Sequence, residues 1–414
     1  MEHDNNVDVY SLQIEELGLR TRECLRVKHT GIEYIGELVQ YDERRLLRLL
    51  CTVFAGRKTL NDIKGALAEK ELGLGMDPQG WIPPNMKRLS NHQYDSNKLI
   101  EEYPAQIHDK NKQVVFDMGL SSAINPATTI AFSRWQMQPL SKTYNRPSRI
   151  ELYNSLGLEG YFEYKPTSEE QTDWHMNFAH EELFACYGGS LFAQDEMQVA
   201  EHPVLASLRE CLVDSNINRL TEDGGVATPI LISGVERRCC IDISPNASEG
   251  KPDGLYGNNF SEVSTDAIKR ATEVLNPPTI SNIIAMESPP LGRGRYTRDQ
   301  IGFILSSAYT GFKAAVALTE TGKRAAIHTG YWGCGAYGGN RDLMALLQII
   351  AAQFAKVDTL YFYTGVDATG YNKALKLYDD LVPADIYGNR MSDTEQLIDT
   401  ITALEFQWGV SNGT

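Results

Sequence analysis

A glycine-rich segment between an apolar strand pattern and an apolar helix pattern constrains this chain most. Residues 325–329 read AAIHT, YWGCGAYGGN follows over 331–340, and RDLMALLQIIAAQFA fills 341–355. Strand, glycine loop and helix start favour phosphate binding, because glycines let backbone N–H groups approach an anion and the helix start adds the positive end of its dipole. Glycine spacing alone is equally compatible with a tight turn that binds nothing. The flanking sequence therefore has to decide between these interpretations.

Length and charge narrow the class of protein. A chain of 414 residues predicts two to three domains, and 42% apolar with 22% charged residues is typical of a globular protein with a sizeable core. The formal net charge of -15 repels nucleic acid unless basic residues gather in one place. Any contact with DNA is therefore expected to be local.

Cysteine and histidine placement argues against disulfides and metals. The seven cysteines show no repeated C-x-x-C spacing, which predicts a reducing cytoplasm. His175, His202 and His328 are scattered, so we expect no catalytic metal. The acidic start MEHDNNVDVY is unlike a signal peptide, and no stretch reaches about 18 apolar residues. We therefore expect a protein that is not exported and has no membrane partner.

The first 85 residues read as a small all-α domain. Helical apolar spacing covers 20–28, 42–50 and 58–69, and Pro83-Pro84 then predicts a boundary near residue 85. Between residues 20 and 64 there are ten basic and six acidic residues, a local balance of +4. Positive charge thus gathers in this stretch of an acidic protein.

The remainder divides into 86–150, interpreted as a linker with peripheral helices, and 151–414, interpreted as an α/β domain. The second part alternates strand and helix patterns, which predicts a mixed sheet with helices on both faces. Strands are expected at 160–164, 174–178, 230–234, 280–285, 325–329 and 360–364. Helices are expected at 202–212, 298–318, 341–354 and 370–381.

The glycine loop and its flanks decide the first question. The run HTGYWGCGAYGGNRDLMALLQIIAAQFAKVDTLYFYTG closely resembles the signature of the poly(ADP-ribose) glycohydrolase family, as do ILISGVERR, IIAMESPP and GFILSSAYTGFKAAV. The resemblance implies a macrodomain core whose loop wraps the diphosphate of an ADP-ribose unit. Tyr337 takes the place of the family's loop Phe and would pack over the ligand. The loop residues implied to bind are Gly333, Cys334, Gly335, Ala336, Tyr337, Gly338 and Gly339.

A second segment, NFAHEELFACYGGSLFAQDE over 177–196, resembles the family's catalytic element. The resemblance implies that Glu196 is the catalytic acid and Asp195 its neighbouring carboxylate, with Glu181 and Glu182 as weaker candidates. Cleavage of a ribose O-glycosidic bond needs an acid to protonate the leaving oxygen and negative charge nearby, and adjacent carboxylates raise one another's pKa. This sequence departs from the family in having two glycines and a short spacer, and His180 where the family has Asn. The other residues implied to bind are Gln194, Phe178, His180, Gly188 and Gly189.

Residues 14–84 resemble the C-terminal domain of the bacterial RNA polymerase alpha subunit. In that family an Arg enters the DNA minor groove and a helix-start turn holds phosphate, in keeping with the chemistry of arginine and free helix amides. Glu23 replaces the family's Asn, and a carboxylate facing the groove would weaken DNA binding. The residues implied to contact DNA are Arg20, Cys24, Gly56, Lys58 and Thr59.

Together these features predict an ADP-ribosyl glycohydrolase tethered to DNA or RNA polymerase, which uses water and needs no organic cofactor. Two alternatives stay open: a reader that binds ADP-ribose without hydrolysis, and a transcription regulator that senses an ADP-ribose-like nucleotide. The sequence does not choose between polymeric, mono-ADP-ribosyl and small-nucleotide substrates.

Overall fold

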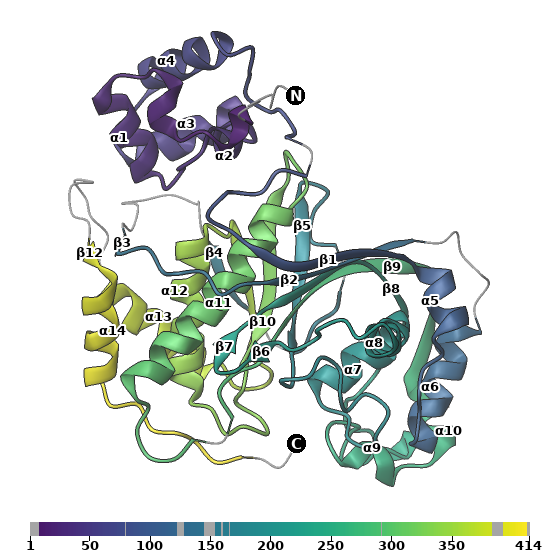
Figure 1. Ribbon diagram of the computed structural model, residues 1–414. Coiled ribbons are helices and arrows are strands. Elements are labelled where there is room, and N and C mark those ends of the chain that lie inside the picture. Colours follow the sequence, from purple (N-terminus) through teal and green to yellow (C-terminus); the bar gives the residue numbers. More distant parts are fainter. Residues whose placement is uncertain are drawn as a thin grey trace.

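The N-terminal unit is a bundle of short helices with a core of its own. The computed structural model describes residues 8–78, 80–121, 128–144, 154–158, 160–164, 166–290, 292–382 and 392–411 (Figure 1). Buried Leu, Ile and Val side chains from the helices that begin at Ile14, Thr21, Ile35, Glu43 and Arg57 form one cluster. The expected helices at 20–28, 42–50 and 58–69 are confirmed. The helices are Val9–Ser11 and Ile14–Leu17 (both 3-10), α1 Thr21–His29, α2 Ile35–Val39, α3 Glu43–Thr52 and α4 Arg57–Ala68.

An eight-stranded mixed sheet forms the larger unit, in the order β1-β2-β8-β9-β5-β10-β11-β4. Neighbours from β1 to β9 are antiparallel, whereas β9, β5, β10, β11 and β4 run parallel. The strands are β1 Arg88–Asp95, β2 Thr129–Trp135, β4 Asn154–Leu158, β5 Gln171–Phe178, β8 Ile230–Ile241, β9 Thr272–Met286, β10 Arg324–Gly330 and β11 Thr359–Tyr363. Two short ribbons pair β3 Thr143–Tyr144 with β12 Ser392–Asp393, and β6 Glu222–Asp223 with β7 Val226–Ala227.

Helices cover both faces of this sheet, and each face has its own core (Figure 1). Alternation along β8 and β9 divides the two cores: Leu231 and Ile284 enter one, and Ile232 and Ile283 enter the other. The first core contains α11 Arg298–Leu318, α12 Arg341–Ala355, α13 Thr369–Leu381 and α14 Thr394–Ala403. On the other face lie α5 Ser96–Glu102, α6 Lys110–Leu120, α7 Gln194–Glu201, α8 Val204–Asp214, α9 Asn259–Glu262 and α10 Thr265–Ala271. The fold class expected from sequence is confirmed.

Two sequence expectations need revision. Residues 160–164 are not a strand, because Gly160 and Tyr164 have φ of +84° and +53°, which turn the chain; the parallel edge strand is β4 instead. Residues 88–95 and 129–135, assigned by sequence to a linker with peripheral helices, form the two strands at one end of the main sheet.

Helix α11 is long and apolar enough to cross a membrane by length and composition, although polar residues interrupt it and no run of 18 apolar residues occurs in it. Most of its apolar length, 61%, is buried inside the protein. Residues such as Ile304 and Phe312 lie in the core under the sheet. The apolar length of α11 is thus accounted for by packing.

The two units are in contact through the loop between α1 and α2, through α3 and through the segment that follows α4. The Arg45 guanidinium binds both carboxylate oxygens of Asp358 at 2.8 and 2.7 Å and also donates to the Lys323 carbonyl at 3.2 Å. Lys356 Nζ donates to the Gly31 carbonyl, and Thr321 Oγ1 donates to Asp77 at 3.0 Å. The helical unit is therefore docked against the end of the sheet at which β10 and β11 begin.

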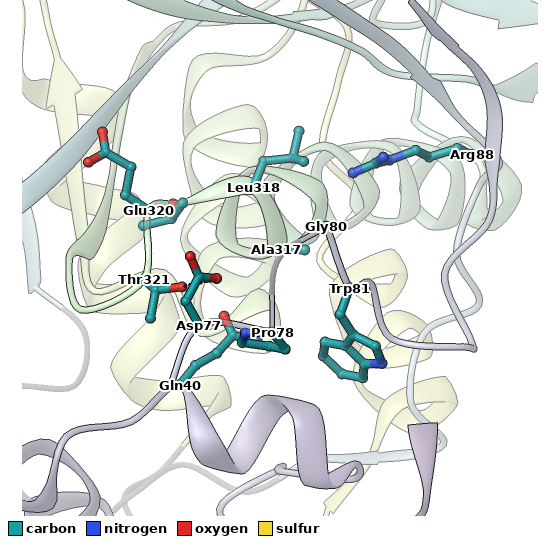
Figure 2. A pocket seen from close by; sticks show the side chains of 11 residues that line it. Gln40, Asp77, Pro78, Gly80, Trp81, Arg88, Ala317, Leu318, Glu320 and Thr321 are labelled. Carbon is teal, nitrogen blue, oxygen red and sulfur yellow. Dashed lines mark hydrogen bonds between the residues drawn. The ribbon is translucent and has the colours of Figure 1, made fainter. Parts of the chain in front are cut away.

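An open pocket of about 200 Å³ lies at this junction (Figure 2). Figure 2 shows Arg88 and Trp81 on one side, with Asp77 and Thr321 facing them across the opening. The end of α11 completes the wall. The residues implied by sequence to act on ADP-ribose do not line it, so this pocket is separate from the site described next.

Candidate functional site

The two sequence segments implied in catalysis meet where parallel strands end. Phe178 at the end of β5 pairs with Met286 at the end of β9, and β10 ends beside them at Gly330. The carbonyl of Met286 accepts hydrogen bonds from the Ala179 N–H at 3.1 Å and from the Trp332 indole at 3.0 Å. Ligand sites in open α/β sheets form at the carboxyl ends of parallel strands. The fold thus brings the 177–196 segment and the glycine loop to one edge.

Hydrogen bonds join the end of β5 to the start of α7. Gln194 accepts from the Phe178 N–H at 2.7 Å and donates to the Met176 carbonyl at 3.0 Å. The Asn177 amide donates to Asp195 Oδ1 at 2.9 Å. At the helix start, Glu196 Oε2 accepts the Ala193 N–H at 3.0 Å. These bonds fix the carboxylates of the first turn of α7 under the edge of the sheet.

Asp195 and Glu196 form a buried carboxyl pair, 7% and 4% exposed. Burial and the charge of Glu196 raise the pKa of Asp195 to about 7. Burial likewise raises the pKa of Glu196, although Lys112 and backbone N–H donors oppose the rise. Since two adjacent buried carboxylates resist simultaneous ionisation, the pair holds one proton near neutral pH.

The glycine loop offers free backbone donors. Hydrogen bonds within it engage the N–H groups of Cys334, Gly338 and Gly339, at 3.0, 3.1 and 2.9 Å. Within the part of the chain that the structure describes, no acceptor engages the N–H groups of Gly335, Ala336 and Tyr337. Free backbone N–H groups are donors that an anion can use.

The loop glycines allow tight packing against neighbouring segments. A Cβ on Gly333 would meet Ser288 Oγ at 2.1 Å, and one on Gly338 would meet the backbone N of Ser411 at 2.9 Å. Both residues have positive φ, +71° and +67°. Gly409 N–H donates to the Gly338 carbonyl at 2.8 Å. A side chain at position 338 would therefore strain the loop and meet the C-terminal segment that packs on it.

Glu287 is a site residue that sequence reasoning missed. It directly follows β9, is 6% exposed, and accepts the Tyr337 hydroxyl at 3.0 Å. Burial, together with the charges of Glu222 and Glu181, raises the pKa of Glu287 to about 7. A carboxylate directly after a buried strand in IIAMESPP was the available signal. Tyr337 is thus anchored by a hydroxyl that the family's Phe lacks.

The other candidate residues of the 177–196 segment differ in their exposure and in their hydrogen-bond partners. His180 is exposed, and its Nδ1 accepts the Glu182 N–H at 3.1 Å. The weaker candidate Glu182 pairs with Arg219 and Arg209, and the Arg219 hydrogen bond lowers its pKa, which suits a structural carboxylate better than a general acid.

The two glycines of this segment differ from each other. Gly188 packs so closely on the Gln106 carbonyl that a Cβ would meet it at 2.2 Å, whereas a Cβ on Gly189 would have ordinary contact with the Cys186 carbonyl at 3.5 Å. The requirement for glycine at 188 therefore comes from the neighbouring backbone. No group of three His, Cys, Asp or Glu suited to hold a metal occurs among the described residues.

The residues implied to contact DNA divide into surface and core. Arg20 at the start of α1, and Gly56 and Lys58 at the start of α4, are exposed. Cys24 and Thr59 are buried, 6% and 3% exposed, and their side chains face inward. Glu23, expected to face the groove, is also buried at 8% exposure.

Comparison with known families supports both resemblances. Residues 230–373 match the family model for poly(ADP-ribose) glycohydrolase of macrodomain fold, and residues 1–69 match the model for the C-terminal domain of the bacterial RNA polymerase alpha subunit. The first match contains the glycine loop and Glu287, whereas Asp195 and Glu196 precede it. The protein therefore combines a segment similar to a macrodomain-fold glycohydrolase with a segment similar to the polymerase domain, and both resemblances are confirmed.

Individual relatives either match a small part of this chain or share little sequence identity with it. The RNA polymerase alpha subunit of Rickettsia felis is 43% identical over 84 residues, which is 20% of this chain and 24% of that protein, so the protein spans about a quarter of this curated relative. The poly(ADP-ribose) glycohydrolase structure from Thermomonospora curvata is 13% identical, covering 70% of this chain and 85% of that one, with a TM-score of 0.36. The Deinococcus radiodurans glycohydrolase in complex with ADP-ribose is 11% identical, covering 71% and 95%, with a TM-score of 0.37.

Proposed function

We propose that the larger unit hydrolyses a ribose O-glycosidic bond of an ADP-ribosyl group. The observation that carries the proposal is the buried Asp195–Glu196 pair, which retains a proton near neutral pH at the strand edge that also carries the glycine loop. The match of residues 230–373 to a glycohydrolase family supports the same chemistry. Free N–H groups at 335–337 would bind the diphosphate of the substrate.

In the proposed reaction the proton that Asp195 and Glu196 share passes from Glu196 to the leaving oxygen as the bond from that oxygen to the ribose anomeric carbon breaks. The negative charge retained by the pair stabilises the positive charge that develops on the ribose. Water then adds to the anomeric carbon and returns its proton to Glu196. The products are the freed hydroxyl compound and a ribose with an anomeric hydroxyl, so protons and atoms balance.

The test is Glu196→Gln, assayed for release of free ADP-ribose from a radiolabelled ADP-ribosylated substrate. An amide oxygen still accepts the Ala193 N–H, so the loop keeps its shape while the acid is lost. We expect turnover to fall about 10²- to 10⁴-fold, with ADP-ribose affinity measured by calorimetry nearly unchanged. Asp195→Asn run in parallel tests which carboxyl delivers the proton. Near-full activity of Glu196→Gln would remove the acid role from Glu196.

A reader function is the alternative outcome of the same experiment. The free N–H groups at 335–337 favour binding whether or not the carboxyl pair is catalytic. If the unaltered protein binds ADP-ribose by calorimetry but releases none from any labelled substrate, the hydrolase proposal is wrong and the reader interpretation replaces it.

We propose further that the helical unit holds the enzyme at DNA. Arg20, Gly56 and Lys58 are exposed, whereas docking on the larger unit uses Gly31 and Arg45. The two functions therefore do not compete for one surface. RNA polymerase is the second candidate partner, suggested by the family match of residues 1–69.

Fluorescence anisotropy of the full-length protein with promoter DNA across a salt series tests this proposal. Arg20→Ala and Lys58→Ala should each weaken binding and reduce the salt slope by about one. The matched control is Lys98→Ala, which removes an exposed charge from α5 in the larger unit. Equal effects of all three variants, or no salt-dependent binding, would leave protein contacts as the role of the helical unit.

A further inference from the structure

Lys112 is a fully buried cation that the proposed chemistry leaves unexplained. Its side chain is 0% exposed, although it lies on α6 in the stretch that the sequence assigned to a linker. Burying an ammonium group is costly unless hydrogen bonds and opposite charge compensate for lost water. The hydrogen-bond partners and charged neighbours of Lys112 therefore indicate its role.

Hydrogen bonds tie Lys112 to the loop before the two glycines. Nζ donates to the carbonyl of Tyr187 at 2.8 Å and to that of Cys186 at 3.5 Å. The N–H groups of His108 and Asp109 donate to the Gly188 carbonyl at 2.9 and 3.1 Å. The loop that leads into the carboxyl pair is thus held by the segment just before Lys112 and by Lys112 itself.

Tyr187 adds a third attachment between the same two segments. Its hydroxyl accepts the Gln106 N–H at 2.6 Å and donates to Glu210 at 2.9 Å. The close approach of Gly188 to the Gln106 carbonyl, described above, completes the contact. The position of the 184–192 loop therefore depends on residues 106–112.

The charge environment of Lys112 includes both members of the carboxyl pair. The negative groups that act on it are Glu196 and Asp195 from α7 and Asp109 from the start of its own helix. The Cys186 thiol from the loop also lies near it, and burial raises the pKa of that thiol. Burial lowers the pKa of Lys112 to about 8, and these groups oppose the decrease. Asp195 in turn has Glu196, Asn177 and Lys112 around it, and Glu196 has Lys112 and His180. The charge of Lys112 thus lowers the pKa of both carboxyls, against the rise that burial causes.

We propose, building on the hydrolase function above, that Lys112 is a positioning residue which holds the catalytic loop and keeps one carboxyl of the Asp195–Glu196 pair ionised while the other stays protonated. Proposed catalysis needs both forms at once, since one carboxyl donates a proton and negative charge must stay beside the ribose. Without the cation, the buried pair would lose its compensating charge. Both carboxyls would then hold their protons to higher pH, because a nearby positive charge favours the ionised form.

The experiment compares Lys112→Met with Lys110→Met, which removes an exposed lysine two residues away on the same helix. Melting curves first establish that both variants fold. The expected result for Lys112→Met is an activity profile displaced to higher pH by about one unit, a tenfold change in the protonation equilibrium of the pair. Lys110→Met should follow the unaltered protein. An equal loss at every pH, without displacement, would mean that Lys112 only supports the fold and would overturn the proposal.

A second measurement separates this inference from the proposed function. Carboxyl 13C shifts of Asp195 and Glu196 can be followed against pH by NMR whether or not the protein is a hydrolase. We expect their titrations to move upward in Lys112→Met and, in the unaltered protein, to show an inflection near pH 8 as Lys112 loses its proton. Titrations that are the same in both proteins would refute the role of Lys112, even if hydrolysis is observed. If Lys112→Met does not fold, the absence of that inflection in the unaltered protein would refute it.

Discussion

The Arg45–Asp358 ion pair should hold the helical unit on the larger one. Arg45 binds both carboxylate oxygens of Asp358, and the two side chains are 24% and 10% exposed. Asp358 also accepts the Ala325 N–H at 2.8 Å. This hydrogen bond holds Asp358 at the start of β11 independently of Arg45. Arg45→Ala therefore removes the contact from one side only and leaves a largely buried carboxylate behind.

The magnitude follows from this partial burial. Breaking a fully buried pair by removing one partner costs about 3–5 kcal/mol, whereas an exposed pair contributes about 0–1 kcal/mol. Arg45 is about a quarter exposed, and Asp358 keeps one N–H donor when Arg45 is removed. We therefore expect Arg45→Ala to weaken the docking of the two units by about 2 kcal/mol. The helical unit has its own core, so it should stay folded when it undocks.

Scanning calorimetry of Arg45→Ala, Asp358→Ala and the double variant measures this coupling. The control is Arg44→Ala, because Arg44 is exposed on the same helix. We expect the helical unit to melt separately in Arg45→Ala. The coupling energy between Arg45 and Asp358, obtained from the two single variants and the double variant, should be well above the roughly 0.3–0.5 kcal/mol within which the effects of independent sites add. A coupling energy within that limit, or a single unchanged transition, would refute this account of docking.

Three further predictions concern the candidate site at the carboxyl ends of β5, β9 and β10. The folded state holds the Asp195 proton up to about pH 7, while the unfolded polypeptide releases it near pH 4, so stability falls as pH rises between these values. Asp195→Asn should flatten this slope in urea titrations, and an unchanged slope would contradict the assignment. Gly338→Val should lower the melting temperature by straining positive φ, at a cost of about 1–3 kcal/mol, and by meeting Ser411; an unchanged melting curve would be incompatible with this packing. Tyr337→Phe removes a hydrogen bond that lowers the pKa of Glu287, so the Glu287 carboxyl should titrate at higher pH by NMR, and an unshifted titration would rule this out.

Local sequence determined the helical unit and the glycine loop. Apolar spacing predicted α1, α3 and α4 because each of these helices buries one face against its own neighbours. The run from 325 to 355 predicted β10, the loop and α12, since an apolar strand pattern, glycines and an apolar helix pattern follow one another without interruption. The resemblance also pointed to Asp195 and Glu196, which the fold does bring to the same edge as the loop.

Only the tertiary structure identified Lys112, Glu287 and the segment 405–411 as neighbours of that edge. Lys112 reaches the Tyr187 carbonyl across 75 positions of the sequence, and Glu287 meets Tyr337 across 50. Contacts at such separations leave no periodic pattern in the sequence, because they depend on which strands pair and in what order. The order β9-β5-β10 places three distant strand ends side by side, and the buried charges acquire their shifted pKa values only after that assembly removes water from them.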